Sequence, residues 1–231
     1  MREILIIGGG AAGLMAAVCA KERDASARVT LLEAGERVGK KLLSTGNGRC
    51  NLTNVGARAE DYAPADVRGV LEQEPPRRVM ERFERMGLTF RQEGEGRVYP
   101  ASDAASSVLD TLRLTAAHLG VEEVVGFCAE QVMHGKKGFA VRAQDGRSMR
   151  SDRLILSCGG QAASKFTGYD LAGALGHTVT ALRPGLLPVK TDGAGIRGLI
   201  GVRCRCAAVL LRVGRAVRRE VGEVLFKDFG L

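Results

Sequence analysis

The sequence predicts an α/β protein, in which a parallel sheet carries an inserted β-meander and is followed by the beginning of a mostly-β second domain. Three observations near the N-terminus lead to this prediction. Apolar residues 4–7 run directly into a glycine-rich turn, residues 12–22 follow a helical pattern, and apolar residues 29–32 end at the acid Glu33. The order strand, glycine turn, helix, strand and acid is typical of a Rossmann-like βαβ unit that binds a dinucleotide.

The glycine turn carries small residues where a phosphate group would approach the backbone. Gly8 permits the tight turn out of the strand, Gly10 has no side chain to block a pyrophosphate, and Gly13 lets the helix pack closely on the sheet. Ala11 and Ala12 begin the helix, so their free N–H groups would face the phosphates at its positive end. This turn is therefore a candidate cofactor-binding site.

Glu33 predicts the type of cofactor. A carboxylate at the end of the second strand can accept hydrogen bonds from both hydroxyls of a ribose. The same negative charge disfavours a 2′-phosphate. The sequence therefore predicts an unphosphorylated dinucleotide.

A polar loop with two glycines follows this unit within residues 34–54, which read AGERVGKKLLSTGNGRCNLTN. Lys40 and Lys41 stand shortly after the acid. Loops of this kind bring backbone N–H groups, amides and a guanidinium to a ligand. Directly after a dinucleotide unit, the natural ligand is the rest of the same cofactor.

Helices are expected next. Two charged helical patterns between residues 61 and 86 are separated by Pro75 and Pro76, and Pro76 is suited to opening the second helix. A short hairpin is expected around Gly94 and Gly96. These elements are interpreted as scaffold.

A helix followed by several strands is expected between Ser102 and Gly160. Ser102 or Asp103 is expected to cap a helix that ends near residue 119. Residues 121–152 alternate between apolar and polar segments and predict a three-stranded meander inserted in the parallel sheet. The last strand ends in Gly159 and Gly160, a second glycine turn that would pass the cofactor.

The remaining residues predict a domain boundary. A short helix is expected over residues 168–175 and a strand over 177–181, before a linker with two prolines over 183–188. Two further strands are expected over residues 202–212 and 216–226. The predicted domains are 1–187, which binds the cofactor, and 188–231, the beginning of a β-rich substrate domain.

The composition limits the class of protein. The chain has 231 residues, 45% of them hydrophobic and 4% aromatic, which predicts a mainly aliphatic core. Its scattered cysteines favour buried thiols in a reducing compartment, and no metal site is expected. No apolar stretch reaches the roughly 18 residues of a membrane span, and the first residues already belong to a strand. We therefore expect a cytoplasmic protein without a signal peptide or a membrane contact; the sequence does not indicate its oligomeric state.

The charge leaves two interpretations open. A formal net charge of +8 and a pI near 9.5 allow a polyanionic partner such as RNA. An arginine-rich composition combined with an anionic cofactor explains the same charge. Six arginines and no acid occur over residues 203–219: Arg203, Arg205, Arg212, Arg215, Arg218 and Arg219.

Five segments together resemble a known family. They read GGGAAGLMAA, GKKLLSTGNGRCNLTN, GRVYPASDAASSVLDTL, GLLPVKT and GEVLFKDFGL. This combination resembles the HI0933-like, or aminoacetone-oxidase-type, family of bacterial FAD-dependent oxidoreductases over essentially the whole chain. The resemblance implies FAD as cofactor and leaves NAD(P)H open as a transient electron donor.

The resemblance also implies site residues. The Gly-Arg-Cys-Asn loop lies against FAD in the family, and a residue at the start of the meander contacts adenine through its backbone, for which Val132 is the candidate. Asn47 stands where the family has a glycine; because Asn tolerates positive φ, the loop is expected to close. The cofactor residues implied in this way, together with Lys40, are Lys41, Gly46, Gly48, Arg49, Cys50, Asn51, Val132, Gly159 and Gly160.

The function implied is that of a FAD-dependent oxidoreductase that transfers hydride to or from flavin N5. Arg49 would stabilise negative charge on the reduced flavin, and Asn51 would fix the ring. Substrates in the family include small amines, unsaturated ring systems and uridine in ribosomal RNA, so a small-molecule substrate is expected and an RNA (uridine) reductase is an alternative. The chain would be the N-terminal part of a longer enzyme, with weak FAD binding in isolation, or a non-catalytic truncated remnant.

Overall fold

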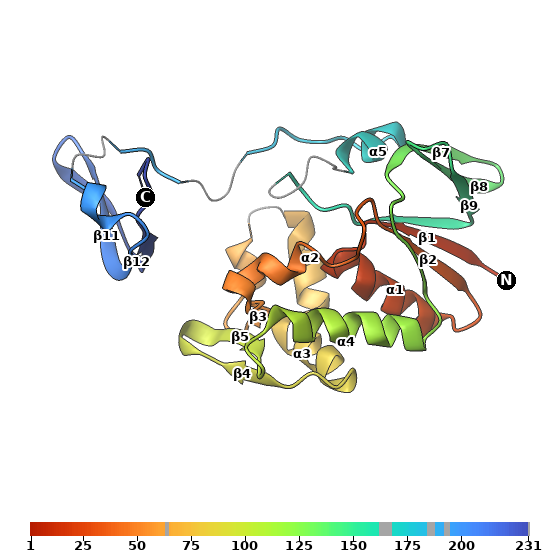
Figure 1. Ribbon diagram of the computed structural model, residues 1–231, viewed down its shortest axis with the longest axis horizontal. Helices are drawn as coiled ribbons and strands as arrows, with labels where there is room; N and C mark the ends of the chain where they lie inside the picture. The colour runs from red at the N-terminus through yellow and green to blue at the C-terminus, as the bar shows by residue number, and fades with distance from the viewer. Residues whose placement is uncertain (63–64, 162–167, 184–187, 192–194, 231) are drawn as a thin grey trace. The chain divides into compact units, whose positions relative to one another are not determined.

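The computed structural model describes residues 1–62, 65–161, 168–183, 188–191 and 195–230. The chain divides into two compact units, Met1–Val179 and Thr180–Leu231. Figure 1 labels most of the helices and strands of both units. Residues 184–187, in the middle of the predicted linker, lie outside the described residues.

A parallel sheet forms the centre of the first unit. Its strands are β1 (Glu3–Ile7), β2 (Arg28–Leu32), β6 (Glu122–Val124) and β10 (Arg153–Leu156), in the order β10-β1-β2-β6. All three neighbouring pairs are parallel. β1 and β2 are nearly continuous apolar runs because both faces of a parallel sheet are covered.

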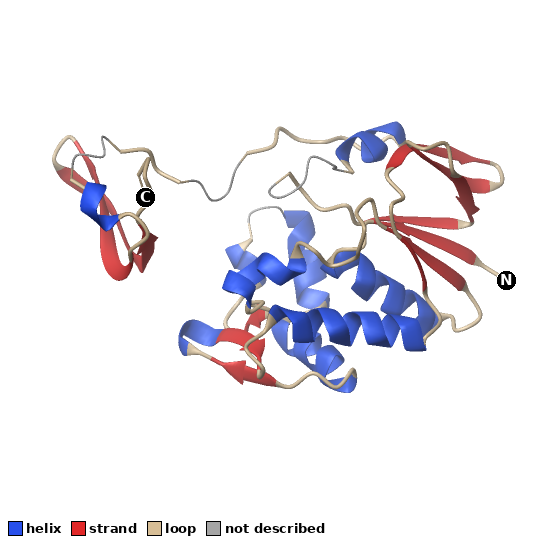
Figure 2. Cartoon of the chain, in the orientation of Figure 1, coloured by secondary structure: helices blue, strands red, loops and turns tan. Residues whose placement is uncertain are grey.

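Helices cover one face of this sheet, as Figure 2 shows. α1 (Ala11–Arg23) packs against β1 and β2, and α4 (Ala105–His118) packs against α1. Ile6, Leu14 and Leu112 meet in the core between these layers, each at most 1% exposed. Helix α1 is held in place by burying Leu14, Ala17 and Val18, with Met15 and Ala20 partly buried beside them.

An antiparallel meander covers the other face. It consists of β7 (Ala129–Gly135), β8 (Gly138–Ala143) and β9 (Ser148–Ser151). A second apolar core between meander and sheet contains Leu5 and Phe127. The predicted three-stranded meander in a parallel sheet is thus confirmed.

The limits of this meander differ from the prediction of residues 121–152. Glu122–Val124 joins the parallel sheet as β6, because its residues continue the ladder beside Thr30–Leu32. Helix α5 (Tyr169–Ala174) follows β10 and contacts β7. The strand predicted over residues 177–181 is wrong: no strand is formed there.

Smaller elements complete the first unit. The two charged helices are confirmed, and Pro76 opens the second. The prediction that Ser102 or Asp103 caps α4 is wrong, since the N-cap is Ala104 and no side chain caps it. The hairpin around Gly94 and Gly96 is present. The elements are α2 (Ala65–Gln73), α3 (Pro76–Arg85), β3 (Thr53–Asn54), β4 (Phe90–Gln92), β5 (Arg97–Pro100), η1 (Leu42–Gly48), η2 (Ala59–Asp61) and η3 (Gly94–Gly96).

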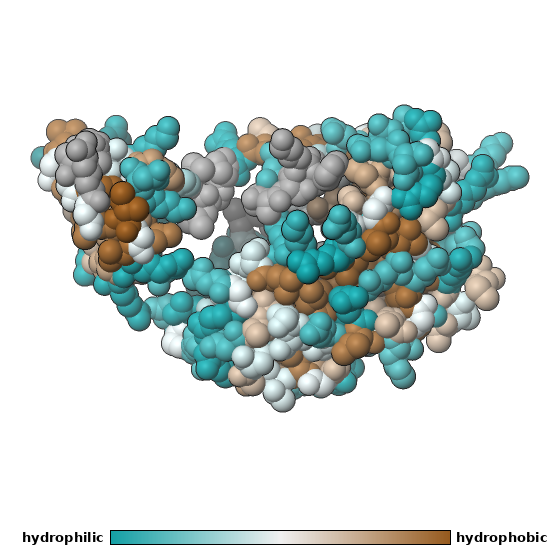
Figure 3. All heavy atoms as spheres, viewed as in Figure 1, coloured by the Kyte–Doolittle hydropathy of each residue, from teal (hydrophilic) through white to brown (hydrophobic). Residues whose placement is uncertain are grey.

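The second unit contains one long hairpin. It is formed by β11 (Arg203–Arg212) and β12 (Arg215–Leu225), with the short η4 (Arg197–Leu199) before it. Leu210 and Val213 remain exposed, at 63% and 96%, and apolar surface is visible on this unit in Figure 3. A two-stranded hairpin gains little stability by itself in water.

Among the residues that the structure describes, no helix combines the length and the apolar character needed to span a bilayer. All six cysteines are free thiols.

Candidate cofactor site

Three chain segments meet at the carboxyl ends of the parallel strands. Gly8 follows β1, Glu33 follows β2 and Ser157 follows β10. In open parallel sheets, ligands bind at this edge because the loops there converge and the helix N-termini point towards it. The candidate site is therefore assembled from residues that are far apart in sequence.

The first glycine turn is closely packed on one side. Gly8 has a φ of +106° and donates its N–H to the Leu32 carbonyl at 2.8 Å. A Cβ on Gly8 would lie 2.6 Å from the Ser157 carbonyl oxygen, and one on Gly13 only 1.9 Å from the Gly8 oxygen. The close packing of helix on sheet expected at Gly13 is present, and neither position has room for a side chain.

The other side of the same turn is open. A Cβ on Gly10 would meet no atom within 4 Å, and both Ala11 and Ala12 are exposed. The first backbone bond within α1 runs from the Leu14 N–H to the Gly10 carbonyl, at 3.0 Å. The N–H groups of residues 10–13 are therefore available to a ligand, and at the positive end of a helix that ligand is an anion.

Glu33 lies beside this turn. One carboxylate oxygen accepts a 2.8 Å hydrogen bond from the Gly9 N–H, and the other accepts one of 2.8 Å from the Gly35 N–H. Each oxygen retains a second lone pair for a hydroxyl donor. The acid is thus held in one orientation against the glycine turn.

Two neighbours of the turn were missed by reasoning from sequence. A Cβ on Gly9 would lie 2.6 Å from the side chain of Val38, and the Gly39 N–H donates to the Gly9 carbonyl at 2.8 Å. Gly39 has a φ of +74° and a Cβ there would lie 2.1 Å from Leu109. A glycine directly after an apolar residue in a polar segment was the available signal.

The loop after this segment contains several left-handed residues. The φ values are +54° at Gly46, +58° at Asn47, +84° at Gly48 and +57° at Cys50. The expectation that Asn47 closes the loop in place of glycine is therefore confirmed. A left-handed backbone costs a non-glycine residue about 1–2 kcal/mol, so contacts outside the loop must stabilise this conformation.

The side chains of this loop differ in exposure. Cys50 is only 7% exposed and packs in the first core, where burial raises the pKa of its thiol. Lys40, Lys41 and Asn51 are exposed, and the Lys41 ammonium lies 3.8 Å from where a Cβ on Gly159 would be. The buried Cys50 thiol anchors the loop, whereas the exposed residues are free to contact a ligand.

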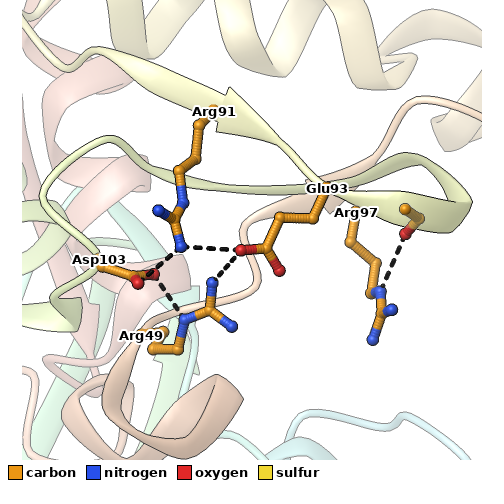
Figure 4. A network of polar contacts seen from close by, with 6 residues as sticks. Arg49, Arg91, Glu93, Arg97 and Asp103 are labelled. Atoms are coloured by element: carbon orange, nitrogen blue, oxygen red, sulfur yellow. Dashed lines mark hydrogen bonds and ion pairs between the residues drawn. The ribbon is translucent and has the colours of Figure 1, made fainter.

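Arg49 has a dense set of partners, shown in Figure 4. Its Nε donates to Asp103 at 2.5 Å, and one Nη donates to Glu93. Its guanidinium also stacks on the Tyr99 ring, 4.0 Å from the centroid. The hydrogen bonds to Glu93 and Asp103 raise the pKa of Arg49, and the one from Arg49 lowers the pKa of Glu93.

The second glycine turn is tied to the first. The Ser157 hydroxyl lies 2.9 Å from both the Ile7 and Gly8 carbonyl oxygens and donates to them. Gly159 has a φ of +73°, and a Cβ on Gly160 would lie 3.1 Å from the Tyr169 hydroxyl. The structure therefore brings both glycine turns and Glu33 to one edge of the sheet.

Val132 is placed differently from these residues. Its side chain is 5% exposed in the second core, and it pairs with Val141 in the meander. The segment hydrogen-bonded to Glu33 lies earlier, because the Phe127 N–H donates to the Glu33 carbonyl at 2.8 Å. Backbone contact between Val132 and adenine stays a prediction. The residues directly after Phe127 follow the hydrogen bond to Glu33 more closely along the chain than Val132 does.

The comparison with known families fits this geometry. Residues 2–216 match the HI0933-like protein Rossmann domain. The chain belongs to this family. It is a Rossmann-fold family of flavoprotein oxidoreductases. The α/β fold and the assignment to a nucleotide-binding flavoprotein family, both expected from the sequence, are therefore confirmed.

Two curated relatives are similar to this chain. A "3-dehydro-bile acid delta(4,6)-reductase" of Clostridium scindens is 37% identical over 238 residues, which cover 100% of this chain and 58% of the relative. A "Ribosomal RNA dihydrouridine synthase" of Escherichia coli is 27% identical, covering 80% of this chain and 47% of the relative. The chain spans about half the length of these relatives.

A solved structure shares the fold. The 3-ketosteroid-delta4-(5alpha)-dehydrogenase from Rhodococcus jostii matches with a TM-score of 0.52 at 15% identity, covering 69% of this chain and 46% of that chain. At this identity the match supports the fold alone.

Proposed function

We propose that this chain forms the FAD-binding part of a flavin-dependent oxidoreductase. The observation that carries the proposal is the Gly8–Gly13 turn, which is closed towards the sheet and open at Gly10, with Glu33 held beside it. A Cβ would fill the space in front of Gly10, which is the space that a pyrophosphate needs. The residues present therefore fit the phosphate and ribose of a dinucleotide.

Individual residues would hold different parts of FAD. The N–H groups of residues 10–13 would bind the pyrophosphate, and Glu33 would accept hydrogen bonds from the ribose hydroxyls. Lys41, near Gly159, would add a positive charge opposite the phosphates. Residues 46–51 would contact the remaining part of the cofactor, and we assign binding of FAD to the domain over residues 1–187.

When bound, FAD supplies hydride transfer at its N5 atom. The chain's own residues would orient the cofactor and would shield from water the contacts between the cofactor and the protein backbone. We propose that the substrate is an unsaturated ring system in which a carbon–carbon double bond is reduced, because the relative that is 37% identical is a bile acid reductase. NAD(P)H as electron donor is a further proposal, tested by its consumption in the presence of FAD and substrate.

The test begins with binding. The purified chain is titrated with FAD, and quenching of flavin fluorescence is followed for the wild type and for Gly10→Val. We expect saturable binding in the wild type and a loss in affinity of about 100-fold in the variant, since two isopropyl methyl groups would occupy the phosphate position. No saturation up to about 1 mM FAD would contradict the proposal. Thermal denaturation of both proteins serves as the control for folding.

The proposed substrate class needs a second measurement. The chain with photoreduced FAD is mixed, without oxygen, with an unsaturated 3-keto steroid or with its saturated counterpart. We expect the flavin absorbance to return only with the unsaturated compound. Equal rates with both compounds would exclude this substrate class without affecting the FAD assignment.

A specific observation also supports RNA as a substrate. β11–β12 brings Arg212 and Arg215 directly opposite each other, with exposed Arg218 and Arg219 alongside. Like charges placed in this way repel each other and favour a polyanion. We expect RNA binding that weakens with salt and is lost when Arg215, Arg218 and Arg219 are neutralised together. Binding that is unchanged in that variant would exclude this alternative.

A further inference from the structure

Arg49 is surrounded by charged groups from another part of the chain. Arg91, Glu93 and Asp103 lie in and after β4 and before α4. Arg91 donates to Glu93 at 2.8 Å and to Asp103 at 2.6 Å, and both acids also accept a hydrogen bond from Arg49. Figure 4 shows the resulting ring of two arginines and two carboxylates. The charges cancel within it.

The aromatic ring of Tyr99 completes this arrangement. Tyr99 is 6% exposed in β5, and the Arg49 guanidinium lies over its face. The guanidinium is thus held by hydrogen bonds to two carboxylates and by contact with the face of an aromatic ring. A planar fork meets these requirements, whereas the point charge of a lysine does not. We refer to Arg91, Glu93, Asp103 and Tyr99 as the Arg49 clamp.

The Arg49 clamp holds the chain next to residues with a left-handed backbone. Arg49 lies between Gly48 and Cys50, both of which have a positive φ. After this turn the chain is fixed again, since the Leu52 N–H donates to the Val98 carbonyl at 2.8 Å. Between these points lies Asn51, whose side chain is exposed.

We propose that Glu93 and Asp103, bridged by Arg91, are positioning residues of the cofactor site: they act through Arg49 to hold residues 46–51 in the binding conformation. This inference rests on the proposed function. It also changes the role expected for Arg49, because a guanidinium neutralised by two carboxylates acts on the flavin mainly through geometry. Neither acid needs to touch the cofactor.

The experiment compares the full chain with a Glu93→Gln/Asp103→Asn double variant. Glu95→Gln is the matched control, since Glu95 lies on the same hairpin and pairs with Arg97 at 3.4 Å. Two quantities are measured: FAD affinity by fluorescence quenching, and the alkylation rate of Cys50 without FAD by mass spectrometry. The half-buried Cys19 provides an internal reference for alkylation.

In the double variant we expect FAD affinity to fall and Cys50 alkylation to rise, each by at least about tenfold, the effect of losing one charge-assisted hydrogen bond. The control should stay within about twofold of the wild type in both measurements. The conservative variant Arg49→Lys should behave like the double variant, because the fork is lost although the charge is kept.

Each other outcome contradicts the inference. Unchanged Cys50 alkylation with weaker FAD binding would mean that the acids contact the cofactor directly. Faster alkylation with unchanged FAD binding would mean that the loop conformation does not matter for the cofactor. If the wild type binds no FAD, the proposed function fails, and unchanged alkylation would then show separately that the clamp does not hold the loop.

Discussion

Replacing Gly13 with alanine should destabilise the first unit through a single contact. The added Cβ would lie 1.9 Å from the Gly8 oxygen, whereas such contacts essentially never fall below 3.0 Å. The helix must therefore move away from the sheet by at least 3.0 − 1.9 = 1.1 Å along this direction. The movement would open the core around Leu14, Ala17 and Val18, which are all 0% exposed.

The magnitude follows from two opposing effects. Overpacking of this kind lowers the free energy of unfolding by about 1–3 kcal/mol. Because the contact at Gly13 is severe, we expect a loss near the upper end of this range. Alanine regains about 0.5–1 kcal/mol over glycine within a helix. The net loss is about 2 kcal/mol, which lowers Tm by about 4–8 °C in a chain of this size.

Thermal denaturation followed by circular dichroism measures this shift. Gly10→Ala is the matched control, because Gly10 has a φ of −80° and an added Cβ meets nothing within 4 Å. Its Tm should stay within about 2 °C of the wild type. A Gly13→Ala variant with an equally unchanged Tm would refute the close approach of α1 to β1 on which the cofactor turn depends.

Three further predictions concern other parts of the first unit. Phe127→Ala should lower the free energy of unfolding by about 3–5 kcal/mol, because this side chain is 1% exposed in the second core; urea denaturation measures it, and a loss below about 1 kcal/mol would contradict the packing. Asn47→Val should destabilise by about 1 kcal/mol more than Asn47→Gly, since only the valine is strained at a φ of +58°; equal stabilities would exclude the left-handed turn. Because the hydrogen bond from Arg49 lowers the pKa of Glu93, the stability that Glu93 contributes should be fully present above the ordinary glutamate pKa and lost as pH falls through the lowered value. Unfolding of wild type and Glu93→Gln across this range checks the sign, and a difference that grows as pH falls would contradict it.

The βαβ unit could be predicted from sequence because its signals are local. Glycines, an apolar helix stripe and an acid at the end of a strand all act through neighbouring residues. Val38 and Gly39 were missed because their importance depends on a contact with Gly9, and a glycine after an apolar residue does not by itself predict that contact. Glu122–Val124 was assigned to the meander for a related reason, since only pairing with β2 decides to which sheet a short strand belongs.

The error at Asp103 has a physical cause as well. Asp103 has the residue type of a helix cap, but its carboxylate binds Arg49 and Arg91 instead. An ion pair between distant segments thus replaced a local hydrogen bond. Val132 was named from the resemblance to the family, and its contact with adenine stays a prediction, while the hydrogen bond to the Glu33 carbonyl comes from Phe127.

The bonds from the Ser157 hydroxyl to Ile7 and Gly8 have a consequence for biosynthesis. Strand β1 leaves the ribosome well before its neighbour β10, which with the serine that fastens the turn is translated after the other three described strands of this sheet. At about 5–20 residues per second, β1 waits about 8–30 seconds with one edge open. A nascent chain whose translation is arrested before Ser157 should therefore bind chaperones at β1. When translation continues beyond Ser157, the chaperones should dissociate from β1.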